Sequence, residues 1–465
     1  MSRPSSRTDT AALLAQYDRP GPRYTSYPTA VEFNDSVDTK TYEERLALAN
    51  SASDECLSVY MHLPFCEHRC LFCGCHVIIS PDKSNSSPYL ALLEREIELL
   101  ADRLPDRRSI SQLHLGGGTP TYQSPDQLDH LLTRFFKHFT AAPGAELAVE
   151  VDPRVTTIEH IDALHAHGFN RISLGVQDFT PEVQEAIERV QSIEQTELLV
   201  NHARKRGFRG INIDLIYGLP LQQEESFERT VDEVIRMGAD RTAVYSFAYV
   251  PWIRAHMNKL ADEDFPNREE KFQLFSIARE RFLAAGYEPI GMDHFAKPDD
   301  ELAKAKRDGH LRRNFQGYAV IPATDVLGLG ISAIGDVRGA YVQNVKKLST
   351  YREAIEDGRL SIERGVTCNP DDVLRRDVIH ELMCNFRVDI RRIEAEHNID
   401  FAATFAEDLE DLREHEANGM VNVTDAVIQA TPQGELFIRN IALCFDRYWR
   451  EKHSSGDKPI FSRTV

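Results

Sequence analysis

Three cysteines in one short segment are the residues of this sequence best suited to chemistry. Cys66, Cys70 and Cys73 have the spacing C-x3-C-x2-C, which brings three thiolates together within a single loop. A structural zinc site and a conventional iron–sulfur cubane each use four protein ligands. Three thiolates therefore predict a [4Fe–4S] cluster with one iron that has no protein ligand, and an open iron of this kind binds a small molecule.

Two alternatives stay open on the spacing alone. One is a structural zinc ion, with Cys75 or a distant cysteine as its fourth ligand, and the other is a plain electron-transfer cluster. Eight cysteines in 465 residues are too few for a disulfide-rich scaffold, and the remaining four are scattered at Cys56, Cys368, Cys384 and Cys444. Clustered thiols in such a chain favour metal binding in a reducing compartment.

The elements that must position this loop alternate between β-rich runs and amphipathic helical stretches from residue 57 to about 250. Several helical stretches close on glycine, as helix C-termini do. The alternation predicts right-handed crossovers and an α/β fold, a partial parallel (β/α)6 barrel. The six runs begin at Leu57, Gln112, Glu146, Arg171, Gly210 and Arg241.

Polar residues follow the predicted strands, at the rim that the carboxyl ends of parallel strands share. The cysteine loop follows the first strand, and the glycine-rich turn GGGTP, residues 116–120, follows the second. Because barrel active sites lie at this rim, we expect these segments to meet at one mouth. The next three strands end in Glu150 and Asp152, in Gln177 and Asp178, and in Asp214.

The whole chain divides into three regions. Residues 1–50 form an N-terminal arm with the Pro- and Tyr-rich segment RPGPRYTSYPTA, which predicts extended chain or turns. Residues 51–345 form the barrel domain with an extension that is rich in turns from about 286 onwards. Residues 346–465 are mainly helical, and we predict that they form a C-terminal domain that covers the substrate.

Charge and hydropathy exclude several classes of protein. Lys and Arg number 54 and Asp and Glu 73, so the net charge is −19 and general binding to nucleic acid or anionic membranes is excluded. The polar N-terminal segment lacks the apolar core of a signal peptide, and no run approaches the ~20 apolar residues of a membrane span. We therefore expect a cytoplasmic protein with no membrane insertion.

The motifs together resemble a known family, the oxygen-independent coproporphyrinogen III oxidases of the radical S-adenosylmethionine (SAM) superfamily. The resemblance runs from about residue 17 to 450, nearly the whole chain. The RYTSYPTA arm and Cys75 distinguish this family from radical SAM haem chaperones, which are the first alternative; a non-catalytic iron–sulfur or zinc protein is the second. The similar segments are YMHLPFCEHRCLFCGC, GGGTPTY, EVDPR, ISLGVQDF, NIDLIYGLP, RNFQGY, ELMCNF and RYTSYPTA.

The resemblance implies a reaction and its cofactors. In the family, a [4Fe–4S] cluster reduces SAM to a 5′-deoxyadenosyl radical, which abstracts hydrogen from a propionate of coproporphyrinogen III. The propionates of rings A and B become vinyl groups, which gives protoporphyrinogen IX in haem biosynthesis. The resemblance also implies two SAM molecules in one site, a low-potential electron donor of unknown identity and a monomeric enzyme.

The resemblance also assigns roles to single residues. Cys66, Cys70 and Cys73 are the implied cluster ligands, whereas Cys75 matches a cysteine that is not a ligand. The first SAM is met by Tyr60, Gly117, Glu150 and Ile334. The second is met by Phe72, Gly118, Thr119, Gln177, Arg189, Asp214 and Ala248. Residue type alone leaves other roles open for these residues. The aromatic residues are typical of a hydrophobic core, the acidic residues are typical of helix caps and loops, and Arg189 is typical of a solvated helix surface.

A substrate with four carboxylates needs positive charge inside an acidic chain. The segment KAKRDGHLRRNFQGY supplies Arg312 and Arg313, and Arg439 is a further candidate from the C-terminal region. The alternative is an exposed helix face of mixed charge. One departure from the family pattern is DVRGAY after GISAIG, which weakens the assignment of Ile334.

Overall fold

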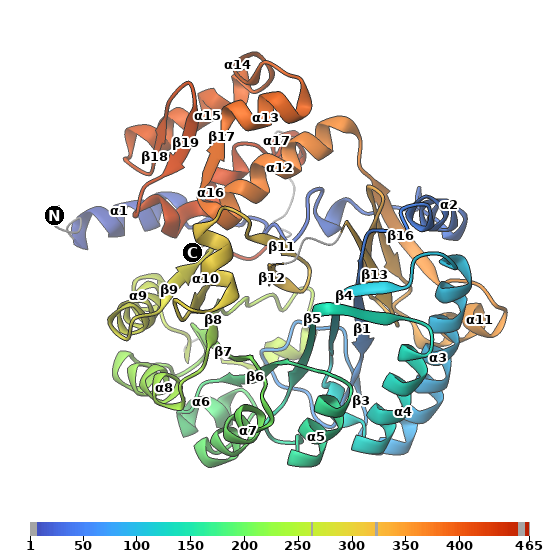
Figure 1. The fold of residues 1–465 in the computed structure, drawn as a ribbon. Coiled ribbons are helices and arrows are strands. Elements are labelled where there is room, and N and C mark those ends of the chain that lie inside the picture. Colours follow the sequence, from blue (N-terminus) through green and yellow to red (C-terminus); the bar gives the residue numbers. More distant parts are fainter. Residues whose placement is uncertain (1–6, 262–263, 321–323, 454–460, 465) are drawn as a thin grey trace.

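A twisted sheet of twelve strands with helices around its outer side forms the main body of the protein (Figure 1). The computed structural model describes residues 7–261, 264–320, 324–453 and 461–464. Six strands lie side by side and parallel in the order of the sequence, as predicted: β1 (Leu57–Leu63), β4 (Ser109–Gly117), β5 (Thr140–Val151), β6 (Arg171–Gln177), β7 (Gly210–Tyr217) and β8 (Arg241–Ser246).

The sequence explains why these segments form a covered parallel sheet. Strand β1 reads LSVYMHL and is buried along nearly its whole length, as strands with both faces covered are. Two of the covering helices end at Gly207 and Gly238, whose φ angles of 91° and 70° lie in the left-handed region. The covering helices are α3 (Ser87–Arg103), α4 (Pro125–Phe136), α5 (Ile158–Ala166), α6 (Pro181–Ala186), α7 (Ile193–Arg206) and α8 (Glu224–Met237).

The sheet is open in the described residues, which confirms a partial barrel. Its edge strands are β16 (Ile362–Thr367) and β9 (Glu288–Ile290), and β9 joins β8 through β10 (His294–Ala296). The helix α9 (Arg268–Ala284) precedes β9 and packs against α8.

A seventh parallel strand lies where the sequence predicted only turns, and that prediction is wrong. Strand β13 (Asp325–Leu329) pairs in parallel with β1, on the side opposite β4. No helix follows β13, so the alternation of strand and helix that revealed the others is absent here. The chain instead continues in antiparallel strands β14 (Ile334–Val337) and β15 (Ala340–Asn344).

Residue 345, where we predicted the end of the barrel domain, lies just after β15. The helix α11 (Leu348–Glu356) beyond it packs on α3, and β16 pairs with β15. The main sheet therefore continues to residue 367.

A buried ion pair joins the first residue of β13 to the loop before β4 and to the segment before β1. Arg107 is completely buried and donates to Asp325 at 2.5 Å and to the carbonyl oxygens of Ala49 and Glu55 at 3.1 and 2.8 Å. Removing one partner of such a pair leaves an uncompensated buried charge. Asp325 also accepts from the backbone N–H of Arg338 at 2.7 Å.

We expect the substitution Arg107→Ala to lower the free energy of unfolding by about 3–5 kcal/mol, measured by urea denaturation. The control is Arg359→Ala, because Arg359 is 56% exposed and pairs with an exposed carboxylate. That change is expected to cost at most about 1 kcal/mol. Equal effects of the two substitutions would contradict the role of the buried pair.

The C-terminal helices form a second layer with its own hydrophobic core, at the top of Figure 1. Its helices surround a small antiparallel sheet of β17 (Arg387–Asp389), β18 (Val421–Val423) and β19 (Val427–Ala430). The helices are α12 (Pro370–Asn385), α13 (Ile390–His397), α14 (Phe401–Thr404), α15 (Ala406–Ala417), α16 (Ile438–Leu443) and α17 (Arg447–His453).

The first part of the N-terminal arm packs on this C-terminal layer. The arm comprises α1 (Arg7–Tyr17), a segment that includes RYTSYPTA and a short 3-10 helix at Ala30–Glu32, and α2 (Thr39–Asn50), which packs instead on α3, β14 and β15. Tyr24 and Tyr27 are buried in the C-terminal core, and the hydroxyl of Tyr24 donates to Asp446 at 2.9 Å. The arm therefore joins the C-terminal helices to the rest of the molecule.

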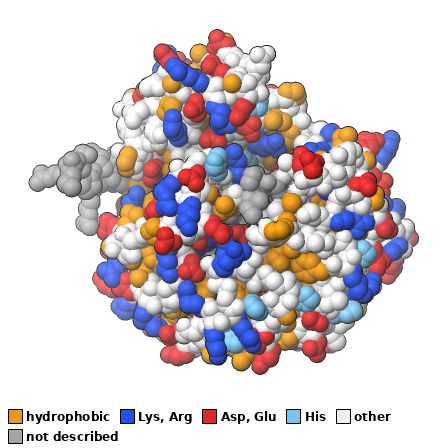
Figure 2. Space-filling view, viewed as in Figure 1, with side chains coloured by type: hydrophobic (Ala, Val, Ile, Leu, Met, Phe, Trp, Pro, Cys, Tyr) orange, Lys and Arg blue, Asp and Glu red, His pale blue; other side chains and the backbone are white. Residues whose placement is uncertain are grey.

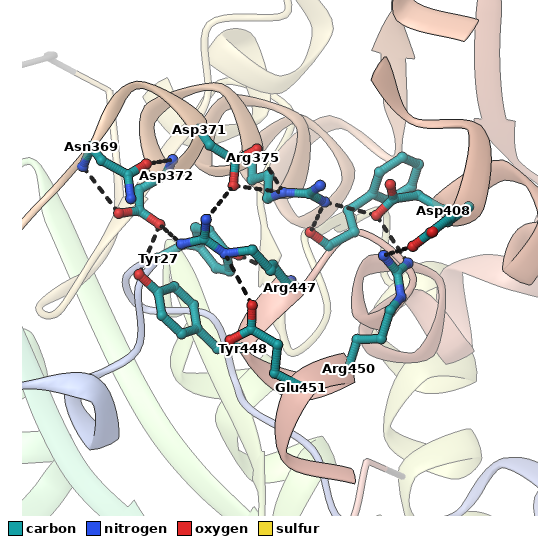
Figure 3. Close-up of polar contacts among 12 residues, drawn as sticks. Tyr27, Asn369, Asp371, Asp372, Arg375, Asp408, Arg447, Tyr448, Arg450 and Glu451 are labelled. Carbon is teal, nitrogen blue, oxygen red and sulfur yellow. Dashed lines mark hydrogen bonds and ion pairs between the residues drawn. The ribbon is translucent and has the colours of Figure 1, made fainter. Parts of the chain in front are cut away.

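Ion pairs secure the same junction (Figure 3). The backbone N–H of Arg447 donates to the Tyr27 hydroxyl at 3.1 Å, and its side chain pairs with Asp372 at 3.0 Å. Arg375 pairs with Asp408 at 2.7 Å in the adjoining part of the network. These contacts connect α17 and the arm to the first turns of α12.

Charges of both signs are interspersed over the face seen in Figure 2, with no extended basic surface. Among the helices of the described residues, none combines the length and apolar character required to cross a bilayer.

Candidate functional site

The cysteine loop lies at the carboxyl end of β1, at one wall of a cavity of about 370 Å³. We call this space the rim cavity. The loop begins in β2 (Phe65–Cys66), which pairs with β3 (Ile78–Ile79) and so folds the segment between them back on itself. Cys66, Cys70 and Cys73 all line the cavity. The structure thus brings the three predicted ligands together.

The chemistry of these thiols suits an iron–sulfur cluster. All three are free, and a hydrogen bond from Cys75 lowers the pKa of Cys73 to about 6, which favours its thiolate. Burial raises the pKa of Cys66 to about 12 in the absence of bound metal. Within the described residues, no three His, Cys, Asp or Glu side chains converge on one point as ligands of a single ion do. A cluster has a wider spacing, because each thiolate binds a different iron.

The glycine turn closes tightly over the cysteine loop. The N–H of Gly118 donates to the carbonyl oxygen of Leu63 at 2.8 Å, and that of Thr119 donates to Phe65 at 2.9 Å. The hydroxyl of Thr119 also lies 3.5 Å from the sulfur of Cys66. These bonds fix the two loops to each other.

Gly117 has a φ of 115°, and a Cβ atom there would lie 2.7 Å from the His62 ring. Only glycine fits this conformation and this contact. Glycine is required here by the close approach of the Gly117 backbone to the His62 ring.

Glu150 projects from the end of β5 into the rim cavity. It accepts a hydrogen bond from His114 at 3.0 Å and one from the backbone of Gly117 at 3.4 Å. Burial raises the pKa of Glu150, but the hydrogen bond and attraction to His114 outweigh it and leave the pKa below its ordinary value. The carboxylate is therefore ionised at neutral pH and available to a cationic or hydroxyl-bearing ligand.

Tyr60 lies against Gly116 beside Glu150, without lining the rim cavity itself. Its hydroxyl lies 3.0 Å from Nδ1 of His62, whose Nε2 lies 2.9 Å from the carbonyl oxygen of His76. Since a carbonyl only accepts, Nε2 carries the proton and Nδ1 accepts from Tyr60. Burial lowers the pKa of His62 to about 4, consistent with this neutral form.

Asp214 of β7 and Gln177 at the end of β6 also line the rim cavity. Asp214 accepts from the Ser173 hydroxyl at 2.8 Å and from the Asn212 amide at 2.7 Å. Burial raises its pKa despite these bonds. Gln177 has a φ of 71°, an unusual conformation at the end of β6 that directs the strand's last residue to the rim.

Arg189 and Phe72 line the rim cavity next to the cysteines, with the guanidinium 6.0 Å from the ring centroid. Arg189 is buried and pairs with Asp152 at 2.9 Å, so it is not the solvated helix residue that its type alone suggested. Eleven of the predicted residues therefore line one cavity: Cys66, Cys70, Phe72, Cys73, Gly117, Gly118, Thr119, Glu150, Gln177, Arg189 and Asp214.

Besides Tyr60, two further predicted SAM residues lie away from the lining. Ala248 is half-buried in the loop after β8. Ile334 begins β14, and its side chain packs beside the cluster that includes Phe33 and Tyr341. Its backbone nevertheless approaches Gly328, the β13 residue paired with Tyr60.

The three arginines predicted for the substrate differ in their surroundings. Arg312 is 41% exposed and pairs with Glu381 at 3.3 Å. Arg439 is buried and donates to the carbonyl oxygens of Gly21, Pro22 and Arg463, so its guanidinium holds the arm and the C-terminal tail. The structure does not bring Arg439 to the rim cavity.

Arg313 is buried in the hairpin of β11 (Arg312–Asn314) and β12 (Gly317–Ala319). Its guanidinium stacks 4.7 Å from the Tyr318 ring, lies 3.9 Å from Asp293, and leaves Nε and Nη1 without hydrogen-bond partners. The same hairpin lines a second cavity of about 140 Å³ inside the barrel, which we call the inner cavity. The two cavities share Glu150, Ser173, Asp214 and Tyr245.

Sequence reasoning missed three residues at the site. His114 holds Glu150, Tyr245 lies between the two cavities, and Arg154 contacts the sulfur of Cys70 at 3.3 Å. Arg154 lies within EVDPR and Tyr245 near the end of a predicted strand. Their positions after or at the ends of predicted strands were the signal that would have placed them at the rim.

Comparison with known proteins agrees with this geometry. The model of the Radical SAM superfamily matches residues 60–234, and that of the HemN C-terminal domain matches residues 368–437. The chain is 44% identical over 441 residues to oxygen-independent coproporphyrinogen III oxidase of Salmonella typhimurium, covering 95% of this chain and 96% of that protein. The corresponding enzyme of Helicobacter pylori strain 26695 is 42% identical over 452 residues, covering 95% and 98%.

The chain belongs to the oxygen-independent coproporphyrinogen III oxidase family. The solved structure described as coproporphyrinogen III oxidase (HemN) from Escherichia coli, a radical SAM enzyme, superposes on this one with a TM-score of 0.89. It is 43% identical and covers 94% of this chain and 98% of that one.

The family and the fold class predicted from the motifs are therefore confirmed. Membership of the superfamily implies a [4Fe–4S] cluster and SAM as cofactors. The free thiols of the rim cavity fit that requirement.

Proposed function

We propose that this protein catalyses the oxygen-independent oxidative decarboxylation of coproporphyrinogen III. The propionates of rings A and B become vinyl groups, and the product is protoporphyrinogen IX. The observation that carries this function is the convergence of three thiols, the glycine turn and two rim carboxylates on one cavity, in a chain that matches the family over nearly its whole length.

The cluster and SAM, when bound, supply the radical that removes hydrogen from the propionate side chain. The protein's own residues hold the reactants and exclude water. Cys66, Cys70 and Cys73 would hold the cluster, and three protein ligands would leave one of its irons available to SAM. The bonds between the glycine turn and the cysteine loop keep that contact rigid.

Two SAM molecules share the site in this proposal. The first contacts Tyr60, Gly117, Glu150 and the backbone near Ile334, where the ionised Glu150 accepts from ribose hydroxyls or the amino group. The second contacts Arg189 with its carboxylate and Asp214 with its ribose. Its other contacts are Phe72, Gly118, Thr119, Gln177 and Ala248.

The substrate's carboxylates bind at the β11–β12 hairpin, below the C-terminal domain of residues 346–465. Arg313 supports this placement because two nitrogen atoms of its buried guanidinium have no hydrogen-bond partner, and its ion pair with Asp293 is long, at 3.9 Å. A planar guanidinium of this kind suits a carboxylate. Arg312, beside it in the chain, is already paired and more exposed.

We expect Arg313→Ala to raise the KM for coproporphyrinogen III about 10- to 100-fold, because the substitution removes a charged hydrogen bond to substrate. Arg312→Ala is the matched control and is expected to change KM less than about threefold. Unchanged KM and turnover in Arg313→Ala would contradict the placement of the substrate at this hairpin.

An anaerobic assay tests the function as a whole. Reconstituted protein is incubated with dithionite, SAM and coproporphyrinogen III, and mass spectrometry follows 5′-deoxyadenosine and the tetrapyrroles. We expect loss of two carbon dioxide molecules per porphyrinogen with deoxyadenosine formed alongside. Deoxyadenosine without decarboxylation would move the substrate elsewhere.

No deoxyadenosine from protein with a verified cluster would favour the haem chaperone, the alternative function. That alternative is not favoured here, because the named relatives that match the chain over 95% of its length are oxidases. We also propose a cytoplasmic monomer that receives electrons from a low-potential donor.

A further inference from the structure

Two arginines converge on the sulfur of a single cysteine in the rim cavity. Nη2 of Arg154 and Nη1 of Arg189 each lie 3.3 Å from Sγ of Cys70. The other two thiols are surrounded differently. The sulfur of Cys66 lies 3.5 Å from the neutral hydroxyl of Thr119, and Cys73 accepts a hydrogen bond from the thiol of Cys75. The guanidinium contacts are therefore specific to Cys70 within the described residues.

Asp152 fixes both arginines in place. It accepts from Nη2 and Nε of Arg154 at 2.7 and 3.0 Å and from Nη1 of Arg189 at 2.9 Å. Burial raises the pKa of Asp152, but the charges of Arg189 and Arg154 outweigh it and keep the pKa below its ordinary value. The carboxylate thus stays ionised and orients two cations toward one sulfur.

The charges at this point do not cancel. Two guanidinium groups and one carboxylate leave an excess of one positive charge beside Cys70, whose side chain is buried. Hydrogen bonds to cluster sulfur and nearby positive charge favour the more negative, reduced state of an iron–sulfur cluster. Both effects are stronger in a buried site than in water.

Arg154 differs from Arg189 in what else it does. Arg189 also donates to the carbonyl oxygen of Gly175 at 2.5 Å, lies over Phe72 and is proposed above to contact the second SAM. Arg154 has no such assignment. Apart from Asp152 and Cys70, its side chain reaches only the carbonyl oxygen of Glu188, at 3.4 Å, among the described residues.

We infer that Arg154 is a positioning residue that raises the reduction potential of the cluster through its bond to Cys70. The step that it assists is the uptake of one electron from an external low-potential donor, which precedes the cleavage of SAM. The inference rests on the proposed function only in requiring that Cys66, Cys70 and Cys73 hold a [4Fe–4S] cluster.

The test is a redox titration of the reconstituted full chain without SAM, followed by the electron paramagnetic resonance signal of the reduced cluster. Arg154→Gln removes the charge and weakens the bond to sulfur, while Arg154→Lys keeps the charge and loses the planar fork. At a fixed potential, we expect the ratio of reduced to oxidised cluster to fall about tenfold in Arg154→Gln, equivalent to 59 mV. The lysine variant should lie between this value and that of the unsubstituted protein.

Arg69→Gln is the matched control. Arg69 also lines the rim cavity and belongs to the cysteine loop, where its charge acts on Cys73, but it donates no hydrogen bond to a cysteine sulfur in the described part of the chain. Arg69→Gln removes the same charge as Arg154→Gln but no hydrogen bond to sulfur. The expected shift in reduction potential is therefore smaller than that of Arg154→Gln. Iron content, at about four per chain, verifies that each variant holds its cluster before titration.

Three results would overturn the inference. The first is an unchanged potential in Arg154→Gln, and the second is an equal shift in Arg69→Gln. The third is loss of the cluster from both Arg154 variants, which would make Arg154 a residue that retains the cluster. The titration uses no coproporphyrinogen, so a shift in protein that fails to decarboxylate would support the role of Arg154 and contradict the proposed function.

Discussion

Cys70→Ala is expected to lose both its iron–sulfur cluster and its activity. Cys70 is the most buried of the three thiols of the rim cavity and the one toward which Arg154 and Arg189 are oriented. Alanine offers no ligand, and two cations would face a site without its thiolate. Because the reaction then lacks the group that supplies the radical, we expect turnover to fall by at least about 10³-fold.

The measurement is iron and sulfide content after anaerobic reconstitution, together with the assay for deoxyadenosine. Cys368→Ala is the control, because Cys368 is half-buried beyond the main sheet and does not line the rim cavity. It should keep iron and turnover. A fully loaded and active Cys70→Ala would show that another residue takes the place of this ligand.

The alternation of strand and helix was sufficient to predict the core of the fold. Strands β1 and β4–β8 are long apolar runs separated by amphipathic helices, and such a pattern allows one main arrangement. Strand β13 escaped prediction because it is five residues long and is followed by antiparallel strands rather than a helix. Periodicity does not distinguish such a short run from a turn-rich segment.

The site was predicted in two different ways. Rim position indicated Glu150, Gln177 and Asp214, since residues after parallel strands meet wherever the sheet forms. Family motifs added the others, including Ala248 and Ile334, which the structure places outside the cavity lining. Residue type alone did not predict which arginines lie at the site.

Arg439 and Arg313 show why arginines need the structure. Both are buried, but the hydrogen bonds of Arg439 go to backbone carbonyl oxygens of the arm and tail, whereas Arg313 has two nitrogen atoms without a hydrogen-bond partner. That difference depends on segments more than 400 residues apart, such as Pro22 and Arg439. No local pattern in the sequence contains it.

Gly118 of the glycine turn and Gly74 of the cysteine loop offer a sharper comparison than any charged residue. Gly118 is packed so closely that a Cβ atom would lie 2.5 Å from the carbonyl oxygen of Pro64 and 2.7 Å from that of Phe65. Both obstructing atoms are backbone atoms of the segment that carries Cys66, so they move only if the cysteine loop moves. Gly74, in the same loop, has no atom within 4 Å of its Cβ position.

We therefore expect Gly118→Ala to displace the cysteine loop and reduce turnover about 100-fold or more, since misplacing a reacting group by ~1 Å has effects of this size. The same strain should lower the free energy of unfolding by about 1–3 kcal/mol. Gly74→Ala adds the same methyl group where there is space and should leave turnover within about twofold. Rates of deoxyadenosine formation and urea denaturation of both variants measure these effects. Equal behaviour of the two alanine variants would show that the glycine turn tolerates movement and does not hold the cysteine loop in register with the rim.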